Sequence, residues 1–258
     1  MCIRDRSIDV LEEGFLDISR TSKEECCNEL ERMRQLMYTV IPFIHKAIEN
    51  RMKVHLPKYI NSLIYSCFME LFRKSGHILF LSINGLYKNA FHEIRYVLES
   101  VLQAYYIDKG HPKADIMAKI EVLKEIEDMP EFNCGRLIAN KIKIDLPYAP
   151  HRKVLKKEYQ KLSKLIHPSH QQLIDTFVEV STGGGKGIPA TVDCKEISKI
   201  YESTKMMYDI FFFLLINLFP ELKEPLKKDS DFIKSISDYE LILLSKVLEV
   251  RLNTQIEK

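Results

Sequence analysis

This chain lacks tryptophan, is poor in glycine and proline, and carries no large excess of charge of one sign. Its 258 residues include 9 glycines and 10 prolines. An all-β sandwich or barrel needs turn residues at regular short intervals, so this composition argues against one. With 38 basic and 36 acidic residues, the formal net charge is +2. A nucleic-acid site would therefore have to be a local basic patch rather than a property of the whole chain.

Long hydrophobic runs are also missing. The stretch most similar to a membrane segment, "MMYDIFFFLLINLFP", contains an uninterrupted apolar run of only seven residues, Ile210 to Ile216, flanked by Asp209 and Asn217. A transmembrane helix needs roughly 20 apolar residues. The sequence therefore predicts a buried core helix here and no association with a membrane.

The first six residues, MCIRDR, are set apart from the rest of the chain. They match the translation of a transposon-end adapter from a sequencing library, so we interpret 1–6 as an artefact of an assembled metagenomic sequence. On this interpretation the natural start is missing, and residues 7–258 are predicted to form a single domain. A chain of this length can bury one large hydrophobic core.

The cysteines show no pattern typical of a disulfide framework or a zinc site. Five remain when Cys2 is excluded, an odd and scattered set without a Cys-x2-Cys pair. Cys26 and Cys27 are adjacent and would point in divergent directions on a helix, which indicates packing. No secretory signal peptide is visible. The sequence therefore predicts reduced thiols, a cytoplasmic location, no metal site and no cofactor.

Helical periodicity runs through nearly the whole chain. A capping-box pattern at Ser22 and Glu25 predicts the start of the first helix, and Pro42 predicts a kink or break in it. Pro57 and Gly76 predict the two ends of the second helix. No alternating strand is evident, so the predicted fold is all-α, a multi-helix bundle around a long central helix. That central helix and the remaining helices are predicted over 78–108, 112–129, 151–167, 169–180, 193–219 and 231–253.

The predicted central helix carries a polar strip on an otherwise apolar surface. At helical spacing the members of the strip fall within roughly 100° of the circumference. In a helix that packs on most sides, Arg95 and Glu99 would be partly desolvated and would need partners. The strip is then either one wall of a polar cleft or an exposed helix edge with a structural ion pair. Its members are His92, Arg95, Glu99, Gln103 and Tyr106.

The stretch "EYQKLSKLIHPSHQQL", 158–173, places a histidine at a corner between two predicted helices. The residue before a proline is pushed out of helical geometry, so His167 should end one helix at Pro168, and Ser169 can begin the next. One interpretation is a general base with cationic neighbours that hold a phosphate. The other is a turn histidine at the end of its own helix, where the helix dipole favours its protonated form. The polar residues on the preceding turns are Lys161, Ser163 and Lys164.

Two short motifs carry a family resemblance. The Arg-x3-Glu motif "RYVLE" (Arg95 to Glu99) and the Ser-x3-His-Pro motif "SKLIHP" (Ser163 to Pro168) together resemble uncharacterised prokaryotic helical proteins. Those proteins are similar in outline to the HEPN superfamily (higher eukaryotes and prokaryotes nucleotide-binding). The similarity covers about 57–178. It implies a helical bundle, a homodimer and, as in many members, a metal-independent ribonuclease with an Arg-x4-6-His motif across the dimer interface.

The resemblance can be carried over only in part. His167 corresponds to the motif histidine, but Lys161 stands six residues before it, and lysine lacks the bidentate fork of arginine. Either Arg95 supplies the guanidinium from another helix, or the chain is not a nuclease. In an active enzyme His167 would take the proton from a ribose 2′-hydroxyl. Arg95, oriented by Glu99, would stabilise the pentacoordinate phosphate together with Lys164.

Two classes of function therefore remain open. The first is an RNA-directed nuclease or toxin of a prokaryotic defence or toxin–antitoxin system, with RNA as substrate and an antitoxin or another protein as partner. The second is a non-catalytic helical module that binds a protein or a nucleotide, in which the same residues form a structural polar network. A basic cluster over 151–164 fits an electrostatic footprint for RNA phosphates or a solvated helix face.

Overall fold

The computed structural model describes residues 16–127, 157, 160 and 192–250. Within these ranges the secondary structure is helical and no strand occurs, which confirms the predicted all-α bundle. Helical residues 16–25 precede the first labelled helix. The elements are α2 (Cys27–Ile60), α3 (Leu63–Ile83), α4 (Tyr87–Gly110), α5 (Ile116–Glu127), α9 (Cys194–Leu218), η3 (Pro220–Leu222), α10 (Lys223–Lys228), α11 (Ser230–Asp238) and α12 (Ile242–Val247).

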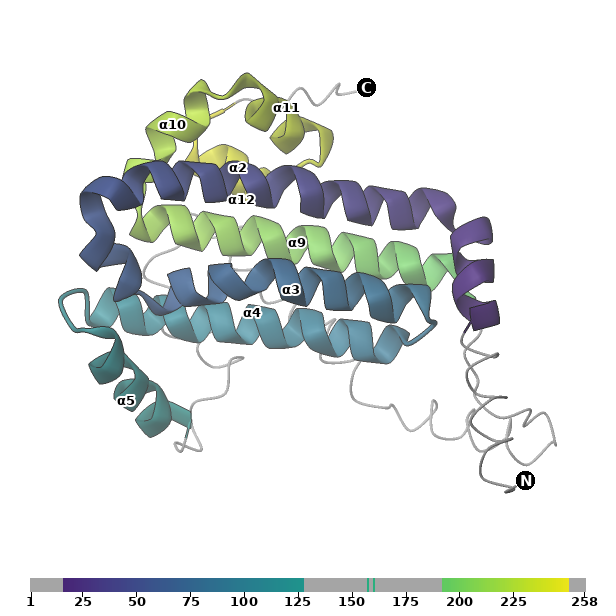
Figure 1. The fold of residues 1–258 in the computed structure, drawn as a ribbon, viewed down its shortest axis with the longest axis horizontal. Helices are drawn as coiled ribbons and strands as arrows, with labels where there is room; N and C mark the ends of the chain where they lie inside the picture. The colour runs from purple at the N-terminus through teal and green to yellow at the C-terminus, as the bar shows by residue number, and fades with distance from the viewer. Residues whose placement is uncertain (1–15, 128–156, 158–159, 161–191, 251–258) are drawn as a thin grey trace.

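Four long helices form the body of the molecule. Helices α2, α3, α4 and α9 lie side by side with nearly parallel axes, and the short helices α10 to α12 gather at the side of α2 and α9 (Figure 1). Helix α5 leaves from the C-terminal end of α4. The closest neighbours are α3 with α4 and α4 with α9, while α12 and α2 also pack on α9.

Among the described helices, α9 is the most deeply buried. All seven residues from Ile210 to Ile216 are buried, so the prediction of a core helix for this stretch is confirmed. None of the helices in the described ranges is long and apolar enough to cross a membrane. The sequence pattern favoured 78–108 for the central position, but α9 rather than α4 is enclosed on most sides, because the short C-terminal helices close over it.

The two sequence signals for the first helix, a start at Ser22 and a kink or break at Pro42, both differ from the structure. Ser22 is buried inside the helical residues 16–25 rather than capping a helix, and the break follows at Cys26. Pro42 lies within α2 without interrupting it; the non-helical residue is His55, two positions before Pro57. Buried residues on both sides of Pro42 pack α2 against its neighbours, and this packing offsets the hydrogen bond that a proline removes.

The boundary between α3 and α4 was also placed wrongly. Gly76 lies inside α3, and the helix ends only at Asn84 and Gly85. Gly85 has φ 70°, the N–H of Leu86 donates to the carbonyl of Leu81 (2.8 Å), and that of Gly85 donates to the carbonyl of Ser82 (3.3 Å). This is a Schellman cap, which requires a left-handed residue and therefore favours glycine. The real stop signal was Gly85 and not Gly76.

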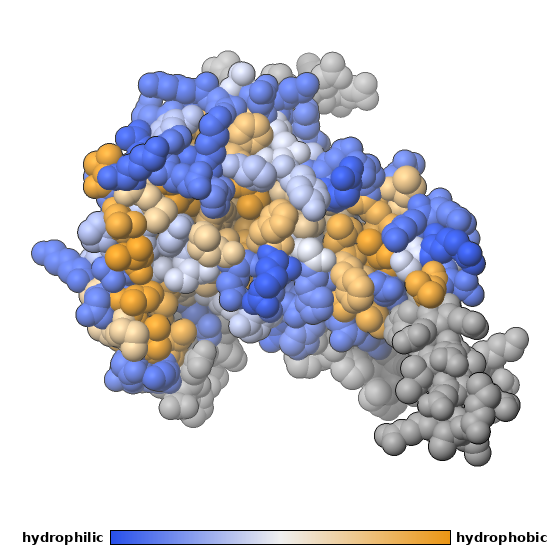
Figure 2. All heavy atoms as spheres, viewed as in Figure 1, coloured by the Kyte–Doolittle hydropathy of each residue, from blue (hydrophilic) through white to orange (hydrophobic). Residues whose placement is uncertain are grey.

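One face of the bundle exposes apolar side chains. Hydrophobic residues lie among charged ones across the face that α2 and α3 present to the viewer (Figure 2). Four large side chains from these two helices are roughly half exposed, at 46–59%. A single exposed apolar residue is normal, but a group of them marks a surface that another molecule can cover. The four are Tyr38, Met69, Phe72 and Phe80.

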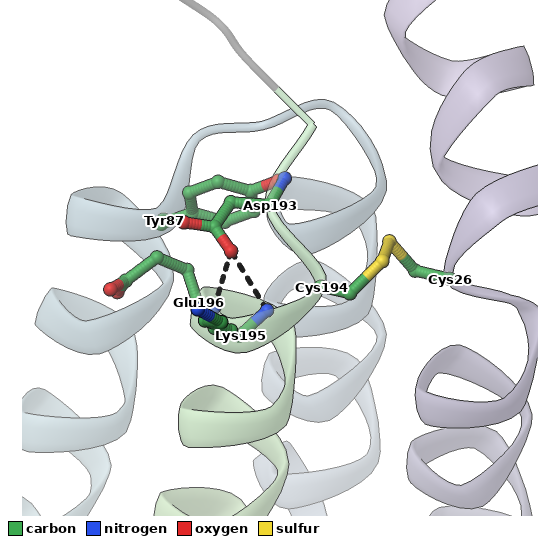
Figure 3. Close-up of a disulfide and its surroundings, with 6 residues drawn as sticks. All are labelled: Cys26, Tyr87, Asp193, Cys194, Lys195 and Glu196. Carbon is green, nitrogen blue, oxygen red and sulfur yellow. Dashed lines mark hydrogen bonds between the residues drawn. A yellow bond between two sulfur atoms is a disulfide. The ribbon is translucent and has the colours of Figure 1, made fainter.

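A disulfide joins the start of α9 to Cys26, the residue between the helical residues 16–25 and α2. Cys26 and Cys194 are bonded although they are 168 positions apart in the sequence (Figure 3). Cys27, in contrast, is a free, exposed thiol. The prediction that the cysteines are reduced is therefore wrong for this pair, because spacing along the sequence gives no sign of a contact made through the fold. Since disulfides persist in oxidising compartments, the cytoplasmic location inferred from reduced thiols stays a prediction without support from the cysteines.

The disulfide sits beside a well-formed helix start. Asp193 caps α9 by accepting from the backbone N–H groups of Lys195 and Glu196, at 2.8 and 3.4 Å (Figure 3). The N–H of Asp193 donates in turn to the Tyr87 hydroxyl at 2.8 Å, which ties the start of α9 to the start of α4. The predicted helix start at 193 is thus confirmed, and its cap is the aspartate.

Candidate functional site

The polar strip on α4 is present in the form that helical spacing predicts. Arg95 donates from Nε to Glu99 Oε1 at 2.8 Å, and the two side chains are 22% and 29% exposed. Both are therefore partly desolvated, as expected for a helix that packs on several sides. His92 is exposed, whereas Gln103 and Tyr106 are half-buried. The strip follows one edge of α4 rather than lining a closed interior.

The second half of the predicted site lies elsewhere in the chain. Four of its residues fall outside the described residues, and so does the corner before Pro168. Of the basic residues within 151–164, Lys157 alone carries a described side chain, and it is exposed. The proposed meeting of the histidine with Arg95 and Glu99 therefore stays a prediction. The four residues are Lys161, Ser163, Lys164 and His167.

The most deeply buried ion pair within the described residues is one that the sequence patterns did not predict. Asp108 and Lys119 are 2.9 Å apart, and their side chains are 4% exposed. Asp108 also accepts from the Ser62 hydroxyl at 2.7 Å and from the backbone N–H groups of Leu63 and Ile64 at 3.1 and 3.0 Å. The carboxylate thus sits at the N-terminus of α3, where the helix dipole favours negative charge.

This network is structural. Lys119 comes from α5, Asp108 from the last turn of α4, and the N–H donors from α3, so one charge cluster holds three helices together. The Lys119 ammonium also donates to the Asn61 carbonyl at 2.6 Å. Because these groups are sealed from solvent and have partners, no substrate can reach them. The sequence does place polar residues at the end of α4 and at the start of α3. It does not indicate that they contact one another; only the fold brings them together.

A groove between α2 and α3 is the larger of the two surface pockets described here among the long helices of the described residues. It has a volume of about 490 Å³. Its rim is aromatic: the Tyr38 ring meets the Phe72 ring edge-on with 5.7 Å between the centroids. The floor is apolar, while the charges stand at the edge. The lining residues are Ile41, Pro42, His45, Lys46, Glu49, Phe68, Met69 and Phe72.

A smaller pocket of about 210 Å³ lies between α3 and α4. Lys74 stands at its edge, 4.4 Å from the centre of the Tyr96 ring and 3.0 Å from Glu93 Oε2. Cys67 also lines it, and burial raises the pKa of the Cys67 thiol to about 12. A thiol with such a pKa is protonated at neutral pH, so it is a poor nucleophile and a poor metal ligand.

Metal ligands do not converge in the part of the chain that the structure describes. There, no three side chains among histidine, cysteine, aspartate and glutamate lie close enough together to hold an ion. The prediction that the protein has no metal concerns the whole chain and stays a prediction.

Comparison with known proteins gives no match: no family model matches the chain, and neither a curated protein nor a solved structure is significantly similar to it. The resemblance to the HEPN superfamily therefore rests on the two short motifs alone. What can be argued about function comes from the surfaces and side chains themselves.

Proposed function

We propose that the protein is a helical protein-binding module and that the face formed by α2 and α3 is its binding surface. The observation that carries the proposal is the apolar groove between these helices, with the half-exposed side chains of Tyr38, Met69 and Phe72 at its edge. Tyrosine, phenylalanine and methionine are enriched at protein interfaces relative to the rest of protein surfaces. A groove of this form suits an apolar helix face as ligand.

The physical properties of the groove support this function. The aromatic contact between Tyr38 and Phe72 holds two large side chains in place before anything binds, so little conformational entropy is lost on binding. Lys46 and Glu49 stand at the rim and carry opposite charges. A dry centre with a polar rim is the usual anatomy of a protein interface. The Arg95–Glu99 pair then acts as a structural ion pair on another side of the bundle.

An apolar dye tests whether the groove binds. We expect 8-anilinonaphthalene-1-sulfonate to bind the native protein at low-micromolar protein concentration with a rise in fluorescence. Met69→Lys should reduce that rise several-fold, because it places a charge at the apolar edge of the groove. Met117→Lys is the matched control, since Met117 is a methionine on α5 that is 62% exposed, against 52% for Met69, and lines neither the groove nor the smaller pocket. Near-UV circular dichroism checks that each variant is folded.

Two results would contradict the proposal. One is a native protein that leaves the dye fluorescence unchanged. The other is a fluorescence rise that Met69→Lys and Met117→Lys reduce equally, because the dye would then report apolar surface in general and not this groove.

The second candidate function is an RNA-directed nuclease of a defence or toxin–antitoxin system. What favours it is that Arg95 and Glu99 form the ion pair that the mechanism requires and keep part of their surface open to solvent. In this proposal His167 is the general base, Arg95 and Lys164 stabilise the phosphate charge, and Glu99 orients Arg95. An antitoxin would then be the expected protein partner.

Cleavage of RNA by the purified chain in EDTA tests this candidate. We expect an active enzyme to cut RNA without a metal, to leave cyclic phosphate ends, and to lose at least a hundredfold in rate in His167→Ala. His111→Ala is the matched control, because His111 is exposed beyond the end of α4. Intact RNA after incubation with the wild type, or equal rates for the two variants, removes the candidate.

A further inference from the structure

We infer that one end of the helical bundle binds the surface of a membrane that contains anionic lipids. This end consists of the last part of α2, 51–60, and of the stretch from the end of α4 into α5, 109–117. The inference goes beyond the proposed protein-binding function, because none of these residues lines the groove between α2 and α3. The sequence predicted no membrane association because a spanning segment is missing, and contact with a membrane surface requires no such segment.

Four exposed aliphatic side chains lie at this end, and we call them the aliphatic patch. Asn61, directly after α2, accepts from the backbone N–H of Ile116, at the start of α5, at 3.2 Å. The end of α2 and the start of α5 are therefore in contact, and Figure 2 shows apolar side chains along this end of the molecule. The patch is 48–71% exposed and consists of Val54, Leu56, Ile60 and Met117.

Buried contacts hold the aliphatic patch in place. Tyr59 is fully buried, and its ring stacks on the Phe219 ring with 4.4 Å between the centroids. The Lys119 ammonium donates to the Asn61 carbonyl at 2.6 Å and pairs with Asp108 at 2.9 Å. Because α2, α4 and α5 meet through these contacts, the exposed apolar side chains project from a fixed base. Little conformational entropy is then lost when the patch binds.

The charge around the aliphatic patch is mainly positive. Residues 51–60 contain three basic residues and no acidic one, and 109–117 contain two basic residues and Asp115. Asp115 accepts from a backbone N–H of α5 at 2.9 Å, Lys58 pairs with Glu221, and Glu121 farther along α5 pairs with Lys124. The excess of positive charge complements anionic headgroups, to which each lysine near the surface adds attraction. The basic residues are Arg51, Lys53, Lys58, Lys109 and Lys113.

The residue types of this end favour a lipid surface over other partners. Protein interfaces are enriched in aromatic residues and depleted in lysine, and sites for single-stranded nucleic acid place aromatic rings between basic residues. Here the exposed apolar residues are valine, leucine, isoleucine and methionine, and four of the five basic residues are lysines. Aliphatic side chains can enter the boundary between headgroups and acyl chains while neighbouring lysines stay at the headgroups.

Cosedimentation of the full chain with lipid vesicles tests the inference. The vesicles consist of phosphatidylcholine, either alone or with about 30% phosphatidylserine, in about 0.1 M salt. We expect the chain to sediment with the phosphatidylserine vesicles and to bind pure phosphatidylcholine at least about tenfold more weakly, because the apolar contact alone is small. Raising the salt to about 0.5 M should also weaken binding, since it screens the lysines.

Two matched pairs of variants locate the contact. Ile60→Gln removes a side chain of the patch that is 52% exposed, and its control is Ile242→Gln on α12, where the isoleucine is 50% exposed. Lys113→Glu reverses a charge beside the patch, and Lys88→Glu makes the same change in net charge at the opposite end of α4. We expect Ile60→Gln and Lys113→Glu to weaken binding about fivefold or more, and the controls by less than about twofold. Near-UV circular dichroism checks the fold of each variant.

Three results would overturn the inference. The first is a chain that stays in the supernatant with phosphatidylserine vesicles or binds both kinds of vesicle equally. The second is binding that Ile60→Gln and Lys113→Glu weaken no more than their controls, because another part of the chain then contacts the lipid. The third is a chain that ignores vesicles but binds poly-L-glutamate through Lys113, which would make an acidic protein segment the partner. Dye binding at Met69 reports separately on the proposed protein-binding function.

Discussion

At the scale of single residues, Asp209 shows how burial and helix capping compete. Its side chain lies within α9 and accepts from the backbone N–H groups of Leu243 and Leu244 at 2.8 Å each, at the start of α12. Burial raises the pKa of Asp209 to about 7, although these hydrogen bonds and the charge of Lys205 act in the opposite direction. The folded state therefore favours the protonated carboxyl more than the unfolded state does.

Because folding raises the pKa of Asp209, the free energy of unfolding should fall as the pH rises. The pKa of the carboxyl is 3.8, its ordinary value, in the unfolded chain and about 7 in the folded one. The raised pKa of Asp209 stabilises the folded state fully below pH 3.8. This contribution, on the order of 4 kcal/mol at most, is lost as the pH rises from 3.8 to about 7. Urea unfolding at pH 5 and pH 7.5 should show a lower free energy of unfolding at pH 7.5, and Asp209→Asn should flatten that slope. Equal slopes in both proteins would contradict the assignment.

Lys119 provides the second test at this scale. Replacing it with methionine leaves the Asp108 carboxylate buried without its charged partner, so we expect a loss of about 3–5 kcal/mol in the free energy of unfolding. The matched control is Lys124→Met, because Lys124 pairs with Glu121 at the surface of the same helix, both side chains being more than 60% exposed, and should change stability little. Similar midpoints in urea for Lys119→Met and wild type would show that the network does not hold α5 in place.

At the scale of elements, the sequence predicted which segments are helical better than where they end. The helix start at 193 was found, because aspartate is a common cap. The splitting of 231–253 into α11 and α12 was missed, since the left-handed residues that end these helices are Glu240 and Glu249 (φ 52° and 57°), and no glycine marks them. Pro42 and Gly76 gave false signals, because packing along the whole helix outweighs a local preference.

The disulfide is an element-scale feature that could not be predicted at all. It closes a loop of 168 residues, and such pairing depends on which helix starts the bundle brings together. Removing a bond of this kind typically costs about 2–4 kcal/mol. We therefore expect Cys194→Ser to lower the unfolding midpoint in urea, and a reducing agent to shift the wild type to the same value. Cys27→Ser should have no effect, because this exposed thiol is free; a midpoint insensitive to the reducing agent would contradict the bond.

At the scale of the whole molecule, the sequence predicted a polar strip but not the surface on which function is proposed here. Helical spacing alone placed Arg95 and Glu99 on one edge of α4, and their ion pair followed from that spacing. The face of α2 and α3 combines Tyr38 with Phe72, which are far apart in sequence and meet only when the two helices pack. Hydrophobic periodicity describes the faces of a single helix, so it cannot predict a groove that forms between two helices.

The distribution of apolar surface and charge gives the molecule two distinct sides. Phe72 and Met69 leave an apolar surface open on α3, while Arg95 and Glu99 on α4 satisfy each other. The central claim is that the apolar side is where the protein meets another protein chain. Hydrogen–deuterium exchange of the full chain with and without saturating 8-anilinonaphthalene-1-sulfonate tests this claim most directly. We predict slower exchange in α2 and α3 when the dye is bound, with α5 unchanged; equal exchange in these two helices, or slowing confined to α4, would contradict it.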